Sequence, residues 1–276
     1  MNHQSYIHAD AQIGKNVAIG PFCYIEEDVV IGDGTWIGPN VTIFNGTRIG
    51  RDCKVFPGAV ISGEPQDLKF QGEKTTAEIG DRTTIREFVT INRGTSYAQK
   101  TVVGSDCLLM AYVHVAHDCI LGDRVILANN VNLAGHVEIE DWAILEGLVA
   151  VQQFTKIGAH SFVAGGSLVR KSVPPFVKAA REPLSYAGIN AVGLKRRQFN
   201  QDMINHIQDI YRILYVKGEN ISNAITQIEE SIQPSKERKQ IIDFIRYSKE
   251  GIIRGFQNIN VNSSKNVNES TTEPGR

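Results

Sequence analysis

The sequence predicts a mainly β protein, in which a parallel β-helix of six-residue repeats is followed by a C-terminal α-helical domain. Three observations predict this architecture. Aliphatic residues recur every six positions from Ile7 to Val169, glycine often follows them, and a helical pattern begins at about residue 191. A fixed short period is the signature of a solenoid, in which stacked coils bury a core that one repeat could not bury alone.

The aliphatic series fills twenty-five positions in one phase, which argues against a chance run of Ile-Gly dipeptides. It runs from Ile7 to Ile61, resumes at Ile79, Ile85 and Ile91, and runs again from Val103 to Val169. Four residues after each aliphatic residue stands one that is small or β-branched. Both positions are therefore expected to point into a narrow interior.

Three repeats make one triangular coil, so residues eighteen apart are predicted to stack. The period does not specify the hand of the coil. A left-handed parallel β-helix is expected because that is the form known for hexapeptide repeats. Glycine and asparagine at the corners are expected to accept backbone conformations that other residues resist. Four cysteines fall on the small interior position, which predicts buried, reduced thiols without disulfide or metal roles: Cys23, Cys53, Cys107 and Cys119.

Two breaks in the phase predict inserted loops at 62–78 and 92–102, and loops that protrude from a solenoid commonly carry binding function. The segment SVPPF (172–176) is expected to end the repeat, because proline cannot join a strand ladder. In the helical part, Gly218 is expected to end the first helix and Ser222 to cap the second. The predicted divisions are a β-helix at 1–175, a helical domain at 176–260 and a disordered polar tail at 261–276.

Composition narrows the class of protein. The formal net charge is −1, which gives no sign of nucleic-acid binding or attraction to a membrane surface. No run of apolar residues is long enough for a membrane span, and the first residues lack the features of a signal peptide. We therefore expect a cytoplasmic protein with no nucleic-acid partner.

Two histidine segments are the candidates for chemistry: HVAHDC, with His114 and His117, and AGH, with His136. One coil beyond His117 lies Gly135, so His136 is expected close to His117 on the outside of the prism. Three interpretations of this pair stay open. The histidines could be solvated surface residues, ligands of a zinc ion as in hexapeptide-repeat carbonic anhydrases, or a general base for a sugar hydroxyl.

The span from residue 7 to about 260 resembles the bacterial UDP-N-acetylglucosamine 3-O-acyltransferases, which act first in lipid A biosynthesis. Eight motifs carry the resemblance, in the family's order: QDLKF (66–70), IGDRTTIRE (79–87), NRGT (92–95), HVAHDC (114–119), LANNVNLAGHV (127–137), VQQF (151–154), VPPF (173–176) and GLKRR (193–197). The resemblance implies transfer of an (R)-3-hydroxyacyl group from acyl carrier protein to the 3-hydroxyl of UDP-N-acetylglucosamine. It also implies a homotrimer with its site between subunits, and no cofactor, metal or covalent enzyme intermediate.

The resemblance also implies roles for individual residues. His117 matches the catalytic base, and Gly135 matches the residue whose backbone N–H stabilises the oxyanion, a contact typically worth about 3 kcal/mol. The remaining matches concern substrate binding: His114 and His136 (nucleotide and phosphate), Gln66, Asp67 and Lys69 (sugar and donor), Gln153 (substrate site), Asn190 and Arg196 (nucleotide), and Gly165 (acyl-chain length). Glycine at 165 predicts a long acyl chain. The chain departs from the family at Val192, where an acidic residue is usual, and at Ala164, where glycine is usual.

Basic residues crowd the end of the repeat and the first predicted helix, where they could receive the acidic carrier protein: Arg170, Lys171, Lys178, Arg181, Lys195, Arg196 and Arg197. Three rival functions are weighed. An N-acyltransferase of the same pathway would carry a further N-terminal domain, whereas the repeats here begin at Ile7. A metal-dependent hydratase would have a wider ligand spacing than that between His114 and His117. A non-catalytic scaffold would leave the histidines without a role.

Overall fold

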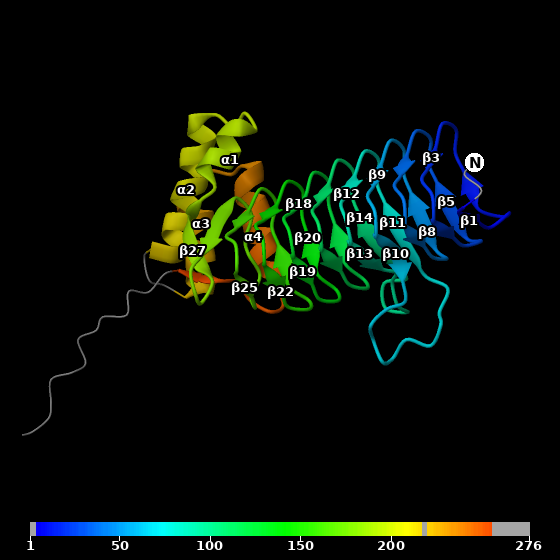
Figure 1. The fold of residues 1–276 in the computed structure, drawn as a ribbon. Coiled ribbons are helices and arrows are strands. Elements are labelled where there is room, and N and C mark those ends of the chain that lie inside the picture. Colours follow the sequence, from blue (N-terminus) through cyan, green and yellow to red (C-terminus); the bar gives the residue numbers. More distant parts are fainter. Residues whose placement is uncertain (1–3, 217–219, 256–276) are drawn as a thin grey trace, which may run out of the picture.

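The structure is a computed structural model that describes residues 4–216 and 220–255. The repeats form a three-sided prism whose faces are parallel sheets, and the helices gather at the end that carries the last coils (Figure 1). Within the repeats, successive strands go to successive sheets, so strands three apart in the chain are neighbours in one sheet. The predicted parallel β-helix followed by helices is therefore confirmed.

The three sheets are named A, B and C. Sheet A contains β1 (Tyr6–Ile7), β4 (Tyr24–Ile25), β7 (Thr42–Ile43), β10 (Val60–Gly63), β13 (Thr90–Asn92), β16 (His114–Val115), β19 (Asn132–Leu133), β22 (Ala150–Val151) and β25 (Leu168–Val169). Sheet B contains β2 (Gln12–Ile13), β5 (Val29–Ile31), β8 (Thr47–Ile49), β11 (Thr76–Ile79), β14 (Lys100–Val103), β17 (Ile120–Leu121), β20 (Glu138–Ile139) and β23 (Lys156–Ile157). Sheet C contains β3 (Ala18–Ile19), β6 (Trp36–Ile37), β9 (Lys54–Val55), β12 (Thr84–Ile85), β15 (Leu108–Leu109), β18 (Ile126–Leu127), β21 (Ile144–Leu145), β24 (Phe162–Val163), β26 (Val177–Ala180), β27 (Ser185–Ile189) and β28 (Arg254–Gly255).

The core is the aliphatic column that the period predicts. Strand partners away from the inserted loops stand eighteen residues apart, as in the pair Leu133 and Val151, and both of these side chains are buried. The first coil is the exception, because no coil is stacked on one of its sides: Ile7 and Ile19 are only partly buried, and Ile13 is 37% exposed. All four cysteines are buried and free, as predicted.

The glycines that follow the aliphatic residues have a different cause from the one expected. A Cβ on Gly32 would lie 2.6 Å from the backbone carbon of Gly50, so glycine is needed there because the next coil is too close. The left-handed φ occurs two residues later in the repeat, and non-glycine residues accept it, for example Asp52 (φ 54°) and Tyr112 (φ 63°). Glycine and asparagine do take this conformation at corners, as expected, for example Gly34 (φ 73°) and Asn40 (φ 55°), but other residues resist it less than expected.

Three corners join the sheets, and one of them receives both inserted loops. The A–B corner joins sheet A to sheet B at segments such as 116–119, 134–137 and 152–155. The first insertion spans 64–75, between β10 and β11, and the second spans 93–99, between β13 and β14. Both are shorter than predicted, because residues at each end join the strands. Since both insertions lie at the A–B corner, they flank the corner segment that contains His117.

The proline segment does not end sheet C. β26 follows it and pairs parallel with β24, and β27 then returns antiparallel. The helices are α1 (Ala191–Arg196), α2 (Gln201–Val216), α3 (Ile221–Ser231) and α4 (Lys236–Tyr247). The buried Tyr211 hydroxyl of α2 donates to the Pro175 carbonyl at 2.5 Å, which fixes α2 to the end of the prism.

Asn220 caps α3 by accepting a hydrogen bond from the backbone N–H of Asn223, so the prediction of Ser222 as the cap is wrong. Gly218 and the predicted disordered tail lie outside the described residues. Among the helices that the structure describes, none is long and apolar enough to cross a membrane.

Candidate active site

His117 and Asp118 form a hydrogen-bonded pair at the A–B corner. Nδ1 of His117 lies 2.8 Å from Oδ2 of Asp118, and the side chains are 11% and 0% exposed. Because the carboxylate can only accept when ionised, Nδ1 of His117 carries the hydrogen and Nε2 keeps a free lone pair. This is the tautomer that a general base requires.

The Asp118 carboxylate is held by the second insertion. It accepts from the backbone N–H of Thr95 at 2.9 Å, from the Thr95 hydroxyl at 2.6 Å and from the backbone N–H of Ala98 at 3.2 Å. Burial alone would raise the pKa of Asp118, but these bonds and the one from His117 outweigh it and lower the pKa. Asp118 is therefore ionised at neutral pH and orients His117. Sequence reasoning missed both Asp118 and Thr95, although they stand in the HVAHDC and NRGT motifs.

His136 and His114 lie close to His117, as the coil count predicts for His136. The rings of His117 and His136 are 5.0 Å apart and nearly perpendicular. Burial lowers the pKa of His136, and Nδ1 of this residue is buried with no hydrogen-bond partner in the structure. Nδ1 of His114 lies 2.7 Å from the Thr90 hydroxyl. Burial and, to a smaller extent, the charge of His117 lower the pKa of His114.

Gly135 packs against the imidazole of His117. A Cβ at this position would lie 2.6 Å from Cε1 and 2.8 Å from Nε2 of that ring. Its carbonyl accepts from the Phe154 N–H, whereas its own N–H has no protein acceptor among the described backbone and side-chain hydrogen bonds. A free backbone N–H therefore lies next to the atom that would accept a substrate proton.

Four predicted residues share the A–B corner with His117. Gln66, Asp67 and Lys69 lie in the first insertion, and the charges of Asp67 and Lys69 act on His136. Gln153 is exposed, and the register of β19 and β22 places it one coil beyond Gly135. The insertion also carries Leu68, whose side chain is fully exposed.

Three predicted residues lie at other corners of the same chain. Gly165 is at the C–A corner, between β24 and β25. Asn190 caps α1 by accepting from the Gly193 N–H, and it donates to the His160 carbonyl at the B–C corner. Arg196, in α1, is exposed, as is Val192. One chain therefore does not bring these residues to His117.

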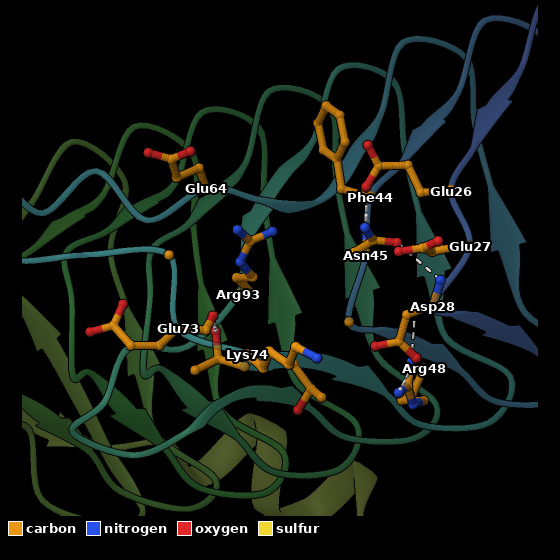
Figure 2. A pocket seen from close by; sticks show the side chains of 14 residues that line it. Glu26, Glu27, Asp28, Phe44, Asn45, Arg48, Glu64, Glu73, Lys74 and Arg93 are labelled. Carbon is orange, nitrogen blue, oxygen red and sulfur yellow. Dashed lines mark hydrogen bonds and ion pairs between the residues drawn. The ribbon is translucent and has the colours of Figure 1, made fainter.

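A hollow of about 740 Å³ lies on the same edge of the prism, between the first insertion and the A–B corners of earlier coils (Figure 2). The charged residues of its lining are mostly acidic: Glu26, Glu27, Asp28, Glu64 and Glu73 against Arg48, Lys74 and Arg93. Arg48 is paired with Asp28 at 2.6 Å. The hollow contains neither His117 nor His136, so it is separate from the candidate catalytic centre.

The metal interpretation fits these residues poorly. His117, Asp118 and His136 offer ligand atoms within 4.8 Å of one another, which is close enough for one ion. However, the Asp118 oxygens already accept four hydrogen bonds, which occupy the lone pairs that a carboxylate offers. A metal at this carboxylate would have to displace the bonds that hold the second insertion.

Comparison with known proteins identifies relatives of this chain. The family model described as "Udp N-acetylglucosamine O-acyltransferase; Domain 2" matches residues 173–253 of this chain. The model described as "Bacterial transferase hexapeptide (six repeats)" matches residues 10–45, 28–63 and 100–135. An acyl-[acyl-carrier-protein]–UDP-N-acetylglucosamine O-acyltransferase of Burkholderia mallei is 45% identical over 201 residues, 71% of this chain and 77% of that protein. The corresponding protein of Thiobacillus denitrificans is 45% identical over 69% of this chain and 74% of its own length.

Comparison with solved structures identifies the same family. A UDP-N-acetylglucosamine acyltransferase of Bacteroides fragilis superposes with a TM-score of 0.91 at 48% identity, covering 92% of this chain and all of that one. The Arabidopsis enzyme of the same description has a TM-score of 0.81 at 30% identity, covering 94% and 100% of the two chains.

The fold and the histidine–carboxylate pair at its corner define a hexapeptide-repeat transferase. More closely, the chain belongs to the acyl-[acyl-carrier-protein]–UDP-N-acetylglucosamine O-acyltransferase family.

Proposed function

We propose that the chain transfers an (R)-3-hydroxyacyl group from acyl carrier protein to the 3-hydroxyl of UDP-N-acetylglucosamine, the first step of lipid A biosynthesis. Membership of the family supports the substrates. The observation that carries the mechanism is the His117–Asp118 pair, with Gly135 against its ring.

His117 acts as the general base in this proposal. Its Nε2 accepts the proton of the sugar 3-hydroxyl as that oxygen attacks the thioester carbon. Asp118 stabilises the imidazolium that forms, because its carboxylate accepts from Nδ1. The carbon–sulfur bond then breaks, and the sulfur of the carrier protein leaves with the proton from Nε2. General-base assistance of this kind contributes about 100-fold or more in rate.

The Gly135 N–H is the proposed donor to the oxyanion of the tetrahedral intermediate. It is free of other protein acceptors among the described residues and adjoins the reacting nitrogen. His114, His136, Asp67 and Lys69 surround the same space and are proposed to hold the phosphates and the sugar, as are Gln66 and Gln153. No step requires a metal or a cofactor.

The distribution of charge over the prism supports a homotrimer. The outward side chains of sheet A carry no formal charge: Tyr6, Tyr24, Thr42, Val60, Thr90, His114, Asn132, Ala150 and Leu168. Those of sheet C from β3 to β24 include one charge: Ala18, Trp36, Lys54, Thr84, Leu108, Ile126, Ile144 and Phe162. Sheet B is the charged face, with Arg48, Glu78, Lys100, Glu138 and Lys156 pointing outward. Depletion of charge marks surfaces that pack in assemblies.

We therefore infer that sheet A of one copy packs against sheet C of the next, with the C–A corners at a three-fold axis. This arrangement places the A–B corner of one copy beside the B–C corner of its neighbour. His117 of one copy would then meet Asn190 and Arg196 of the next, which one chain alone does not achieve. The fully exposed Leu68 would also gain a partner surface.

The same arrangement suggests paths for the donor. The acyl chain would cross the uncharged face of sheet A from His117 toward Gly165 at the far edge, with Ala164 beside it. Arg170 and Lys171 lie at the A–B corner three coils beyond His117, about 14 Å away at ordinary strand spacing. They are proposed to contact the acidic carrier protein, together with Lys178, Arg181, Lys195 and Arg196. Arg197 is less suited, because its guanidinium packs over Trp142 and donates to the Trp142 carbonyl.

An acyl-transfer assay tests the proposal. The native chain would be mixed with UDP-N-acetylglucosamine and 3-hydroxyacyl carrier proteins of several lengths, beside His117→Ala and a control, His8→Ala, at a partly exposed histidine of the first coil. We expect product from the native chain and the control, and a loss of about 100-fold or more in His117→Ala. Absence of product with every donor would contradict the proposal.

Two further measurements separate the alternatives. Sedimentation should give a particle of three chains, and a stable monomer would contradict the shared site. Stoichiometric zinc in the purified active protein would favour the hydratase interpretation. The cytoplasmic location stays a prediction.

A further inference from the structure

Tyr97 is an exposed aromatic residue at the centre of the site that the mechanism above does not use. It lies in the second insertion and is 69% exposed, whereas its exposed neighbours in that loop, Ser96 and Gln99, are polar. An exposed tyrosine is unremarkable by itself. Here its ring stands 4.5 Å from the ring of His136, which in turn lies 5.0 Å from that of His117.

The ring completes an aromatic corner. His136 and Phe154 are stacked at 4.4 Å with nearly parallel planes. Tyr97 stands across both, at 74° to His136 and 67° to Phe154. Tyr97 and Phe154, the latter 42% exposed, provide the open ring surface of this corner beside the catalytic base, because the ring of His136 is stacked on Phe154 and its side chain is only 13% exposed.

The backbone that carries Tyr97 is held in place by the catalytic pair. The Tyr97 N–H donates to the Thr95 hydroxyl, which donates to Asp118, and the next residue, Ala98, also donates to Asp118. The position of the ring is thus tied to the carboxylate that orients His117. Groups held on such supports can align a substrate to within the tolerance that catalysis needs.

We propose that Tyr97 is a positioning residue for the acceptor sugar, whose C–H face packs in the corner formed by Tyr97, His136 and Phe154. This inference rests on the proposed function and specifies where the sugar ring lies. A pyranose offers apolar C–H groups on its face and hydroxyls at its rim. The corner has matching chemistry, because Asp67 and Lys69 act on His136 from the first insertion and can meet the hydroxyls. A long acyl chain would instead need a continuous apolar groove, which these polar insertions do not offer.

Binding measurements without a donor test the inference. Titration calorimetry would compare UDP and UDP-N-acetylglucosamine on the native trimer, Tyr97→Ala, Tyr97→Phe and the control Tyr247→Ala, an exposed tyrosine at the end of α4. We expect Tyr97→Ala to weaken UDP-N-acetylglucosamine about 10-fold and to change UDP by less than about 2-fold. Tyr97→Phe should restore native affinity, since the ring and not the hydroxyl provides the contact.

Kinetics provide the second readout. In Tyr97→Ala, KM for UDP-N-acetylglucosamine should rise about 10-fold, while KM for the acyl carrier protein and the pH profile of kcat stay native. Equal weakening of UDP, a rise confined to KM for the acyl donor, or loss of the trimer would overturn the inference. Sugar-specific binding by a native chain that forms no product would refute the proposed function and leave the role of Tyr97 standing. A native chain that does not bind UDP-N-acetylglucosamine would overturn both.

Discussion

The contact between Gly135 and His117 makes Gly135→Ala a direct test of the mechanism. The new Cβ would lie 2.6 Å from Cε1 and 2.8 Å from Nε2 of His117, whereas ordinary contact begins at 3.4 Å. The ring must therefore move by roughly 0.6 to 0.8 Å. Because Nδ1 is held 2.8 Å from Asp118, this movement stretches that bond or turns Nε2 away from the acceptor. A misplacement of this size costs about 100-fold in rate, or about 2.7 kcal/mol of barrier.

Steady-state kinetics would measure the loss, which should fall on kcat because the backbone N–H and the substrate contacts remain. The double variant with His117→Ala is the control, since removal of the ring makes room for the Cβ. Gly135→Ala should therefore lower the thermal midpoint less in the His117→Ala background than in the native one. If Gly135→Ala kept more than about a third of the native kcat and the native midpoint, the proposed packing of Gly135 against the base would be refuted.

Three other substitutions test separate parts of the structure. Asp118→Asn should lower kcat by about 100-fold or more, because an amide no longer selects the His117 tautomer, while calorimetry should find near-native affinity for UDP-N-acetylglucosamine. Burial lowers the pKa of His160 to about 4 from an ordinary value of about 6.5. The unfolded chain therefore binds a proton at His160 more readily than the folded chain, and the stability of the fold decreases as the pH drops from about 6.5 to about 4. At pH 5 the loss in the free energy of unfolding is about 2 kcal/mol. His160→Phe should remove that part of the pH dependence of stability, as measured by urea denaturation. An unchanged pH dependence would contradict the assignment of this effect to His160. Gly165→Met should shift the products to shorter acyl chains, as measured by mass spectrometry. An unaltered product profile would show that Gly165 does not line the acyl groove.

The sequence by itself determined the solenoid and the part of the site that follows its register. A strict period of six places two inward positions in each repeat, the aliphatic one and the small one four residues later, so the aliphatic column and the buried cysteines could be predicted from spacing. Stacking every eighteen residues then placed Gly135 over His117 and His136 beside it. These predictions succeed because each coil contacts only its neighbours, and so a local pattern is repeated as global structure.

Only the tertiary structure decided the contacts of the segments that do not follow the eighteen-residue register. Thr95 reaches Asp118 over 23 residues, and Tyr97 reaches His136 over a longer span, because the second insertion interrupts the eighteen-residue repeat. No coil count predicts which residue of such a loop meets the corner. The structure also assigned Asn190 and Gly165 to corners other than that of His117, since the order of the sheets, not the distance along the chain, decides which segments share an edge.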